Sequence, residues 1–265
     1  MNNNMKYLTY GKKICIKLKN VYGQEIEGNF SICVVHNPHS NVRQFSNNVM
    51  ELLNDSEKRY ICLKKNDRRI ESYLLGRIAT KYALNHLGTF TYKDIYVVNG
   101  VTGRPIIKYQ GKNSCFSLSI THTGNIGVAI VFDHEYMFGI DIEKIDVGKC
   151  DAIYSQLIGS EKKLVNEYNE KDHILFLMWS AKEALGKYLG IGLSADYKIF
   201  EIKQIVKFEY YYIVEFSHFL KHKVWASFYD NCVLTLALYG VVDIGTLERY
   251  MSDIFRDCET RLSKE

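Results

Sequence analysis

The chain has 265 residues and a mass of 30.8 kDa, enough for one large domain or two smaller ones. Hydrophobic residues make up 47% and charged residues 24%, a composition that excludes a disordered or collagen-like chain. The formal net charge is +4. Such a mildly basic balance suits an anionic small ligand or an acidic protein partner, and it gives no argument for binding nucleic acid.

No part of the sequence predicts membrane insertion or export. No stretch approaches the ~18–20 apolar residues of a membrane span, and the polar start Met1–Lys6 lacks the apolar core of a signal peptide. The seven cysteines include no Cys-x-x-Cys pair, which indicates thiols in a reducing compartment and argues against zinc. We therefore expect a cytoplasmic protein without membrane association.

The first half of the chain is predicted to contain strands and one long helix. Two segments with alternating apolar residues are typical of strands, 12–18 and 30–36. Between residues 68 and 87, apolar residues recur at helical spacing. Residues four apart give this helix a predicted basic face: Arg69, Tyr73, Arg77 and Lys81. Further strands are expected at 95–98, 105–109, 115–121, 126–132 and 137–143.

The second half is predicted to repeat this order loosely. Ser160 followed by Glu161 is typical of a helix start, and a longer helix is expected from about 172 to 189. Strands at 208–216, 223–229 and 232–239 and a short helix at about 246–258 complete the chain. The repeated order predicts an α+β fold of two similar halves that meet near residues 134–138.

The segment FGIDIE, residues 138–143, carries two carboxylates on one predicted strand. Residues two apart share a face, so Asp141 and Glu143 point the same way, about 6–7 Å apart. A Mg²⁺ ion would remove the repulsion between them, and it prefers oxygen ligands. A solvent-facing acidic edge strand is an equally good interpretation of this segment alone.

The segment WSAKEALGK, residues 179–187, lies on the predicted long helix. Trp179, Glu183 and Lys187 are four apart and share one face. An exposed Glu–Lys pair is the simplest interpretation, but the preceding apolar run indicates a buried helix. Because buried charges need partners or a function, we expect Glu183 to be a third oxygen ligand or a base, and Lys187 to face a phosphate.

Two further segments offer donors for phosphate oxygens. In SITHTG, residues 119–124, Thr121 and His122 precede a glycine at the end of a predicted strand. A histidine satisfied by its surroundings is the more common interpretation. In NGVTGRP, residues 99–105, a plain turn explains the glycines, and Arg104 is a candidate partner for a phosphate or carboxylate.

Together these motifs resemble those of a known family. NGVTGRP, SLSITHTG, FGIDIEK and WSAKEALGKYLGIGL occur in this order. The chain thereby resembles the 4′-phosphopantetheinyl transferases, specifically the larger, monomeric surfactin-type class, over residues 60–195. The resemblance implies two similar α+β halves related by pseudo-two-fold symmetry, with the active site in the cleft between them. The N-terminal half, 1–134, would bind coenzyme A, and the C-terminal half, 135–265, would carry the catalytic acids and the carrier docking surface.

The resemblance also implies a reaction and a role for each matching residue. Phosphopantetheine would pass from coenzyme A to a serine hydroxyl of an apo acyl or peptidyl carrier protein, with Mg²⁺ or Mn²⁺, and 3′,5′-ADP would be released. The implied metal ligands are Asp141, Glu143 and Glu183. The implied catalytic residues are Glu183 as the base, Lys187 and His122. The implied coenzyme-binding residues are Arg68, Arg69, Arg104, Thr121, His122 and Lys187. Residues 188–198 would form an apolar docking surface, and a place in the core is the alternative for them.

Two other functions stay open on the sequence. A metal-dependent hydrolase of nucleotide pyrophosphates would use the same acids and would consume coenzyme A without a carrier. A non-catalytic relative would bind coenzyme A or a carrier without turnover, although it would have no need of a third acid.

Overall fold

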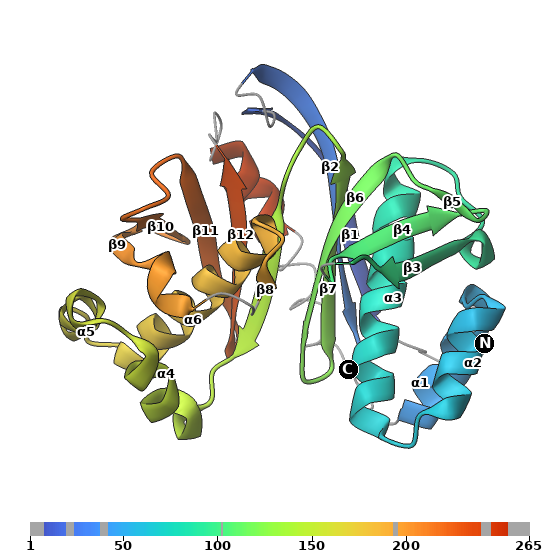
Figure 1. Cartoon of the computed structure of the whole chain (residues 1–265), viewed down its shortest axis with the longest axis horizontal. Helices are drawn as coiled ribbons and strands as arrows, with labels where there is room; N and C mark the ends of the chain where they lie inside the picture. Colours follow the sequence, from blue (N-terminus) through green and yellow to red (C-terminus); the bar gives the residue numbers. More distant parts are fainter. Residues whose placement is uncertain are drawn as a thin grey trace. The chain divides into compact units, whose positions relative to one another are not determined.

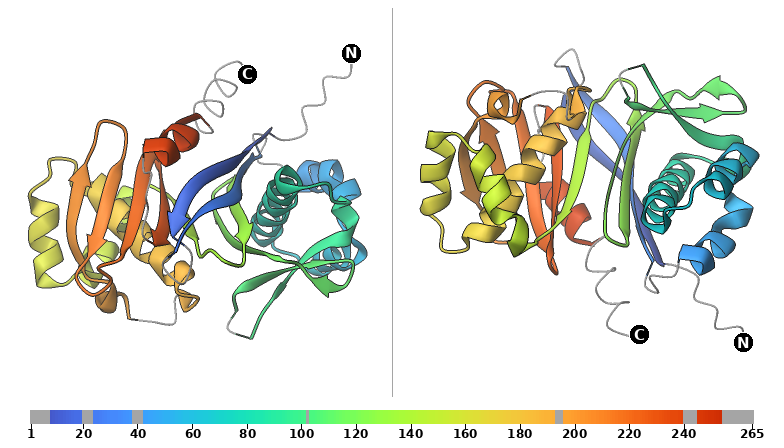
Figure 2. Two further views of the ribbon diagram at one scale, coloured as in Figure 1. Left: turned by 90° about the horizontal axis from the view of Figure 1, so that it is seen from above. Right: turned by 60° about the horizontal axis from the view of Figure 1, so that its bottom comes forward.

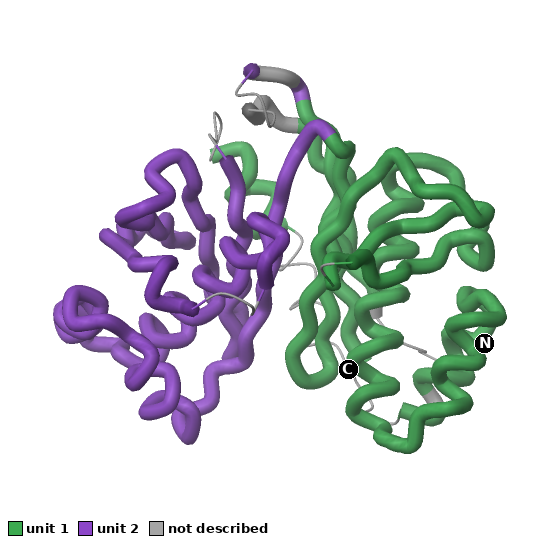
Figure 3. Tube along the Cα trace, in the orientation of Figure 1, with its two compact units in different colours: residues 1–16, 28–134, 245–265 green, residues 17–27, 135–244 purple. Residues whose placement is uncertain are grey.

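The computed structural model describes residues 8–19, 24–37, 42–101, 103–192, 196–239 and 245–253. The chain forms two compact units: residues 1–16, 28–134 and 245–265 make unit 1, and residues 17–27 and 135–244 make unit 2 (Figure 3). The chain passes from unit 1 to unit 2 after His134. A single boundary at residue 134 would assign residues 17–27 to unit 1 and residues 245–265 to unit 2. The chain instead has residues 17–27 in unit 2 and residues 245–265 in unit 1. The two-fold relation predicted between the halves stays a prediction.

Unit 1 contains a four-stranded sheet in the order β1-β2-β7-β6 and a three-stranded sheet in the order β3-β4-β5 (Figure 1). Its strands are β1 (Leu8–Lys19), β2 (Glu25–His36), β3 (Ile95–Asn99), β4 (Pro105–Tyr109), β5 (Lys112–Asn113), β6 (Phe116–Thr123) and β7 (Ile126–Asp133). Its helices are α1 (Val42–Val49), α2 (Asp55–Leu63) and α3 (Asp67–Leu87), with short 3-10 helices η1 (Met50–Leu52) and η2 (Tyr92–Asp94).

The long helix α3 packs on β6 and β7 and builds the core of unit 1. A Cβ atom at Gly127 of β7 would lie 2.6 Å from the Leu75 Cβ atom, so glycine permits this close packing. Leu74, Leu75 and Ile78 are fully buried there. The predicted apolar face of this helix is therefore confirmed.

The predicted basic face of α3 is wrong at Lys81. This side chain is only 1% exposed, and its Nζ lies 2.9 Å from the Glu57 carboxylate. Lys81 also donates to the carbonyl oxygens of Tyr92 and Ile95. Because α2 and the start of β3 cover this side of the helix, the lysine is a buried partner and does not form a basic surface.

Unit 2 contains a five-stranded antiparallel sheet in the order β8-β12-β11-β10-β9, and the long helix α6 packs on β8, β12 and β11 (Figure 2). Its core gathers apolar residues of α6 and of the facing strands. The strands are β8 (Gly139–Lys144), β9 (Ile202–Lys207), β10 (Tyr212–Phe216), β11 (His222–Tyr229) and β12 (Cys232–Tyr239). The helices are α4 (Cys150–Gln156), α5 (Gly159–Asn166) and α6 (Lys171–Tyr188), with 3-10 helices η3 (Val147–Lys149) and η5 (Tyr197–Phe200).

The mixed α and β content predicted from the sequence is confirmed. The final predicted helix is present over residues 245–253, and its remainder lies outside the described residues. The predicted strand at 208–216 is wrong at its start, because residues 208–211 connect β9 to β10 through a hydrogen bond from Phe208 N to Tyr211 O. Among the described residues, no helix is long and apolar enough to span a bilayer.

Candidate active site

The acidic residues of unit 2 lie where strand β8 and helix α6 approach each other closely. A Cβ atom at Gly139 would lie 2.0 Å from the Ala184 carbonyl oxygen and 2.5 Å from the Tyr188 amide nitrogen. Glycine therefore permits this contact. Asp141, two residues along β8, faces α6 as well, because alternate residues of a strand share a face.

Both carboxylate oxygens of Asp141 are engaged by residues of α6. Lys187 Nζ donates to Asp141 Oδ1 at 2.7 Å and to the Ile140 carbonyl oxygen at 3.0 Å. Ser180 Oγ donates to Asp141 Oδ2 at 2.8 Å. The side chain of Asp141 is only 6% exposed. Its carboxylate is thus held in one orientation by an ionic and a neutral donor.

A cross-strand neighbour supports the serine that holds Asp141. Thr235 of β12 is the register partner of Asp141. The Thr235 hydroxyl donates to the Ser180 carbonyl oxygen at 3.0 Å and lies 2.8 Å from Ser180 Oγ. Both hydroxyls are fully buried, so this network satisfies groups that would otherwise cost folding energy.

Glu143 follows Asp141 on the same face of β8, as predicted. Burial raises the pKa of Glu143 to about 7, and the negative charge of Asp141 adds to the shift. Lys149, a hydrogen bond from Trp179 and Lys187 oppose it. A carboxyl group with this pKa is present in both protonation states near neutral pH.

Glu183 of α6 has a similar environment. Burial raises the pKa of Glu183 to about 7, the charge of Asp141 adds to the shift, and Lys187 opposes it. Glu143 contributes a smaller upward shift. The three predicted acids are therefore close enough to act on one another electrostatically. A group that titrates near neutral pH is suited to accept a proton from a substrate hydroxyl.

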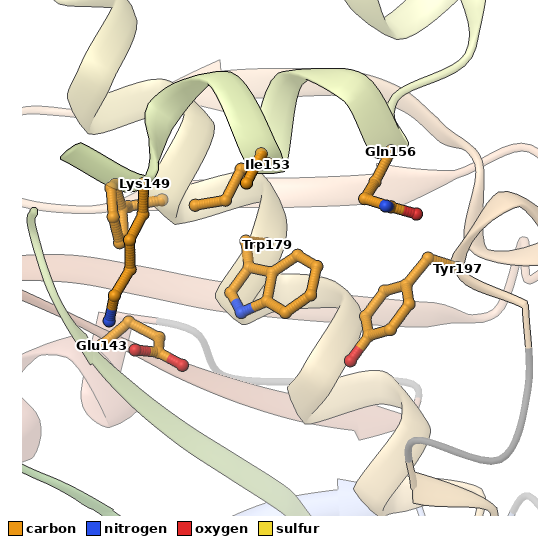
Figure 4. A pocket seen from close by; sticks show the side chains of 8 residues that line it. Glu143, Lys149, Ile153, Gln156, Trp179 and Tyr197 are labelled. Carbon is orange, nitrogen blue, oxygen red and sulfur yellow. The ribbon is translucent and has the colours of Figure 1, made fainter. Parts of the chain in front are cut away.

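A pocket of ≈ 510 Å³ opens beside these acids within unit 2. Figure 4 shows Glu143 and Lys149 at one end, Gln156 and Tyr197 at the other, and Trp179 between them. The rings of Trp179 and Tyr197 are stacked, with centroids 4.5 Å apart and an interplanar angle of 13°. The remaining wall is apolar and consists of Ala152, Ile153 and Phe176. The pocket therefore has mostly apolar walls and a carboxylate at one end.

The predicted metal ligands provide the right donor type without forming a ready-made cage. Asp141, Glu143 and Glu183 supply the carboxylate oxygens that Mg²⁺ takes. Across the described ranges, however, no cluster of three or more His, Cys, Asp or Glu side chains has the geometry of a metal site. Asp141 is instead bound by Lys187 and Ser180. Carboxylate oxygens are ligands that Mg²⁺ prefers, so the donor chemistry of the three acids fits this ion.

The residues predicted to bind the coenzyme lie in unit 1, apart from Lys187. Arg68 and Arg69 are exposed in the first turn of α3, where the Asn66 side chain accepts from the Arg69 amide at 3.1 Å. Arg104 ends the turn between β3 and β4, and its carbonyl accepts from Gly100 N at 2.8 Å. On β6, Thr121 is buried and His122 is exposed, consistent with their alternation along the strand.

Two simpler interpretations of the motifs are excluded by these contacts. Asp141 does not lie on a solvated strand edge, although β8 is the edge strand of its sheet. Lys187 does not pair with Glu183 one turn away on its helix, because its ionic partner is Asp141 of β8. The buried environment predicted for this helix is confirmed.

Sequence reasoning missed three residues around the acids. Ser180 lies inside the motif WSAKEALGK, directly after Trp179. Its presence within the motif was the only indication in the sequence that it belongs to the site. Thr235 comes from a distant strand and could be found only from the sheet register. Tyr197 lies beyond the motif, and nothing in the sequence indicates that it stacks on Trp179.

Comparison with known proteins identifies the family. Residues 137–235, which contain the acids and Lys187, match the model of the 4′-phosphopantetheinyl transferase superfamily. Holo-[acyl-carrier-protein] synthase of Staphylococcus haemolyticus is 35% identical over 86 residues, which are 30% of this chain and 70% of that protein. The chain belongs to the 4′-phosphopantetheinyl transferase superfamily. The prediction of an enzyme of this class is thereby confirmed.

Other similar proteins cover different shares of the chain. Holo-[acyl-carrier-protein] synthase of Oceanobacillus iheyensis is 32% identical over 89 residues, 31% of this chain and 74% of that protein. L-aminoadipate-semialdehyde dehydrogenase-phosphopantetheinyl transferase of Candida glabrata is 30% identical over 112 residues, 39% of this chain. The match spans only 42% of the Candida protein. The crystal structure of Thermotoga maritima holo-[acyl-carrier-protein] synthase aligns at 21% identity with a TM-score of 0.30, over 46% of this chain and 71% of that chain.

Proposed function

We propose that this phosphopantetheinyl transferase moves the 4′-phosphopantetheine group from coenzyme A to a serine hydroxyl of an apo acyl or peptidyl carrier protein. The observation that carries the proposal is the arrangement around Asp141. Its carboxylate is fixed by Lys187 and Ser180, and Glu183 lies close enough to be affected by its charge. A cation, an oriented acid and a group that titrates near neutral pH are the parts that phosphoryl transfer to a hydroxyl requires.

In the proposed reaction, the serine oxygen bonds to the phosphorus at the pantetheine end of the pyrophosphate. The bond from that phosphorus to the bridging oxygen breaks, and 3′,5′-ADP leaves with the bond's electron pair. Glu183 accepts the serine proton, directly or through a water molecule. Lys187 faces the negative charge that develops on the phosphate oxygens. Asp141, Glu143 and Glu183 would hold Mg²⁺, which would supply further positive charge at the phosphates.

The pocket suits the uncharged part of the donor. Pantetheine is a thin chain with two amides, and the pocket has apolar walls around Trp179 and Tyr197. Its end at Glu143 is adjacent to the acids. An arm lying in this pocket would present its phosphate end to Lys187. The nucleotide end would be bound by Arg68, Arg69, Arg104, Thr121 and His122 of unit 1.

The proposal includes the surfactin-type subclass, which acts as a single chain with two similar halves. A shared feature of the two units supports this similarity. In each unit, a glutamate near the start of a short helix pairs with a buried lysine of the long helix. That lysine also donates to the first carbonyl of a 3-10 helix that follows the long helix in the chain. These residues are Glu57, Lys81 and Tyr92 in unit 1 and Glu161, Lys182 and Tyr197 in unit 2.

Intact-mass spectrometry of carrier proteins tests the reaction. Apo acyl and apo peptidyl carriers are each incubated with the protein, coenzyme A and Mg²⁺. At least one of them is expected to gain one phosphopantetheine, with the gain lost in EDTA. Asp141→Asn and Glu183→Gln should abolish the gain and leave the circular dichroism spectrum unchanged. Release of 3′,5′-ADP without a carrier would instead indicate a hydrolase. Binding of coenzyme A without any turnover would indicate a non-catalytic relative.

A further inference from the structure

A buried asparagine at the end of strand β2 connects two other segments of unit 1. Asn37 follows the last residue of β2 and is 1% exposed. Its side-chain amide donates to Glu71 Oε1 of helix α3 at 2.6 Å. Its backbone nitrogen donates to the Asn125 carbonyl oxygen at 2.9 Å, and its carbonyl oxygen accepts from Asn125 Nδ2 at 2.9 Å. Because a buried polar side chain costs stability unless it is hydrogen-bonded, these contacts indicate what Asn37 holds together.

Asn125 belongs to the two-residue turn that joins β6 to β7. Gly124, the other residue of this turn, has a φ of +51°. A positive φ at the first turn position suits the tight turns of hairpins, which favour glycine there. Asn125 Nδ2 also donates to His36 Nε2 at 2.9 Å. The contacts of Asn125 with His36 and Asn37 therefore continue the pairing of β2 with β7 as far as the turn, and they fix the turn to the end of β2.

Glu71 lies in the second turn of α3, shortly after Arg68 and Arg69. One turn further along, Leu75 packs closely on β7. The hydrogen bond from Asn37 to Glu71 adds a second contact on the same face of the helix, nearer to its start. The start of α3 therefore cannot move relative to the turn between β6 and β7 without breaking this buried hydrogen bond.

Four of the residues predicted to bind coenzyme A lie on the two segments that Asn37 connects. Arg68 and Arg69 are exposed at the start of α3, and Thr121 and His122 lie near the end of β6. Guanidinium groups bind phosphate oxygens as forks, and hydroxyl and imidazole groups also donate to them. Coenzyme A carries phosphate at two places, the 3′-phosphate and the pyrophosphate, so two separate groups of donors match it.

Glu71 carries the wrong charge to be a ligand of phosphate. Its carboxylate repels phosphate oxygens, so its contact with Asn37 gives it a place in the structure and no place in the binding of an anion. A neutral acceptor of the same shape would bind Asn37 as well, and this difference separates a positioning role from an electrostatic one.

We propose that Asn37 is a positioning residue, which joins Glu71 and Asn125 so that the two donor groups of unit 1 keep the separation that one coenzyme A molecule needs. Groups held in this way bind the 3′-phosphate and the pyrophosphate together, without an ordering cost at the moment of binding. The inference rests on the proposed function, since it takes coenzyme A as the ligand. It assigns Asn37 no direct contact with the coenzyme.

Calorimetric titration with two ligands tests the positioning. Coenzyme A uses both donor groups, whereas dephospho-coenzyme A lacks the 3′-phosphate and uses only one. The dissociation constant of dephospho-coenzyme A divided by that of coenzyme A therefore reports the benefit of binding both phosphates. In Asn37→Leu this ratio should fall about fivefold, the net value of one hydrogen bond, while the affinity for dephospho-coenzyme A stays near that of the wild type. Partial unfolding would instead lower the stoichiometry of both ligands and leave the ratio unchanged.

The two replacements Glu71→Gln and Glu71→Leu form a matched pair. Both remove the same charge, but only Glu71→Gln keeps an acceptor for Asn37. The ratio should therefore be about fivefold lower in Glu71→Leu than in Glu71→Gln. Asn125→Ala takes the place of Asn37→Leu if circular dichroism shows that Asn37→Leu is unfolded.

Asn85→Leu is the control for the loss of hydrogen bonds elsewhere in unit 1. Asn85 lies at the other end of α3, where it bonds to the Tyr92 hydroxyl and the Phe90 amide at 3.0 Å each. Asn85→Leu should keep the wild-type ratio, and an equal fall in this variant would overturn the positioning role of Asn37. A wild-type ratio in Asn37→Leu, or equal ratios in the two Glu71 variants, would also overturn it. Wild-type protein that binds coenzyme A but modifies no carrier would refute only the proposed reaction.

Discussion

Replacing Gly139 by alanine tests whether the close contact between β8 and α6 holds the acids in place. The added methyl group would lie 2.0 Å from the Ala184 carbonyl oxygen, whereas ordinary contact begins at 3.4 Å. The helix backbone must therefore move by more than 1 Å or the strand must bend. Overpacking against backbone is expected to lower the free energy of unfolding by about 3 kcal/mol. The same movement would separate Lys187 from Asp141 and reduce activity.

The fluorescence of the chain is suited to this measurement. Its two tryptophans, Trp179 and Trp225, both belong to unit 2 and report the unfolding of that unit. In a urea titration, Gly139→Ala should lower the midpoint by ~1 M. Gly159→Ala is the matched control, because a methyl group there meets nothing within 4 Å, and its midpoint should stay near that of the wild type. An unchanged midpoint for Gly139→Ala would refute the reasoning.

Three further predictions concern charge. Glu57→Gln leaves Lys81 buried without its ionic partner, and it should lower the free energy of unfolding by ~3–5 kcal/mol in urea titrations followed by circular dichroism. Burial lowers the pKa of His86 below 6.5, so the stability that neutral His86 provides is complete above pH 6.5 and is lost as the pH falls through the folded value. Between pH 8 and pH 5, the urea midpoint of the wild type should therefore fall relative to that of His86→Asn. At pH 8, Mg²⁺ at ten times its dissociation constant should raise the thermal midpoint by ~3 °C, and Glu143→Gln should lose this shift.

Each of these three has a result that would contradict it. An unfolding curve of Glu57→Gln that equals the wild-type curve would mean that other groups stabilise the buried charge of Lys81. An unchanged pH profile for His86→Asn would remove this histidine as the source of the acid sensitivity. A thermal shift by Mg²⁺ that survives Glu143→Gln would place the ion elsewhere.

The sequence predicted the long helices and most strands because their apolar residues recur with a clear period. Five α-helices and strands were missed: α1, α2, α4, β5 and β9. Helix α2 had a usable signal, since Asn54 and Glu57 form a capping box at its start. Strand β9 had none, because only every third residue is buried along Ile202–Lys207 and alternation is absent. The aromatic run before β10 favoured a longer strand, but it contains the turn that joins β9 to β10.

The acids were found from their spacing, whereas their partners were not. Spacing on one helix predicts contacts within that helix, so it favoured Glu183 as the partner of Lys187. The contact with Asp141 depends on how closely α6 approaches β8, which is set by Gly139. Lys81 was misplaced for the same reason, since the glutamate that buries it comes from another helix.

Lys182 and Glu183 are neighbours on α6, but the first stabilises the fold and the second is proposed to take part in the reaction. This difference has a consequence for mutational scanning. Lys182 is buried against a glutamate of a short helix, as Lys81 is in unit 1, so its pairing serves the packing of helices. Glu183 follows it directly and has Tyr82 at the corresponding place in α3. A scan that scores only enzyme output would rate both positions as intolerant. A parallel scan of cellular abundance should separate them, with depletion at residue 182 and normal levels at residue 183.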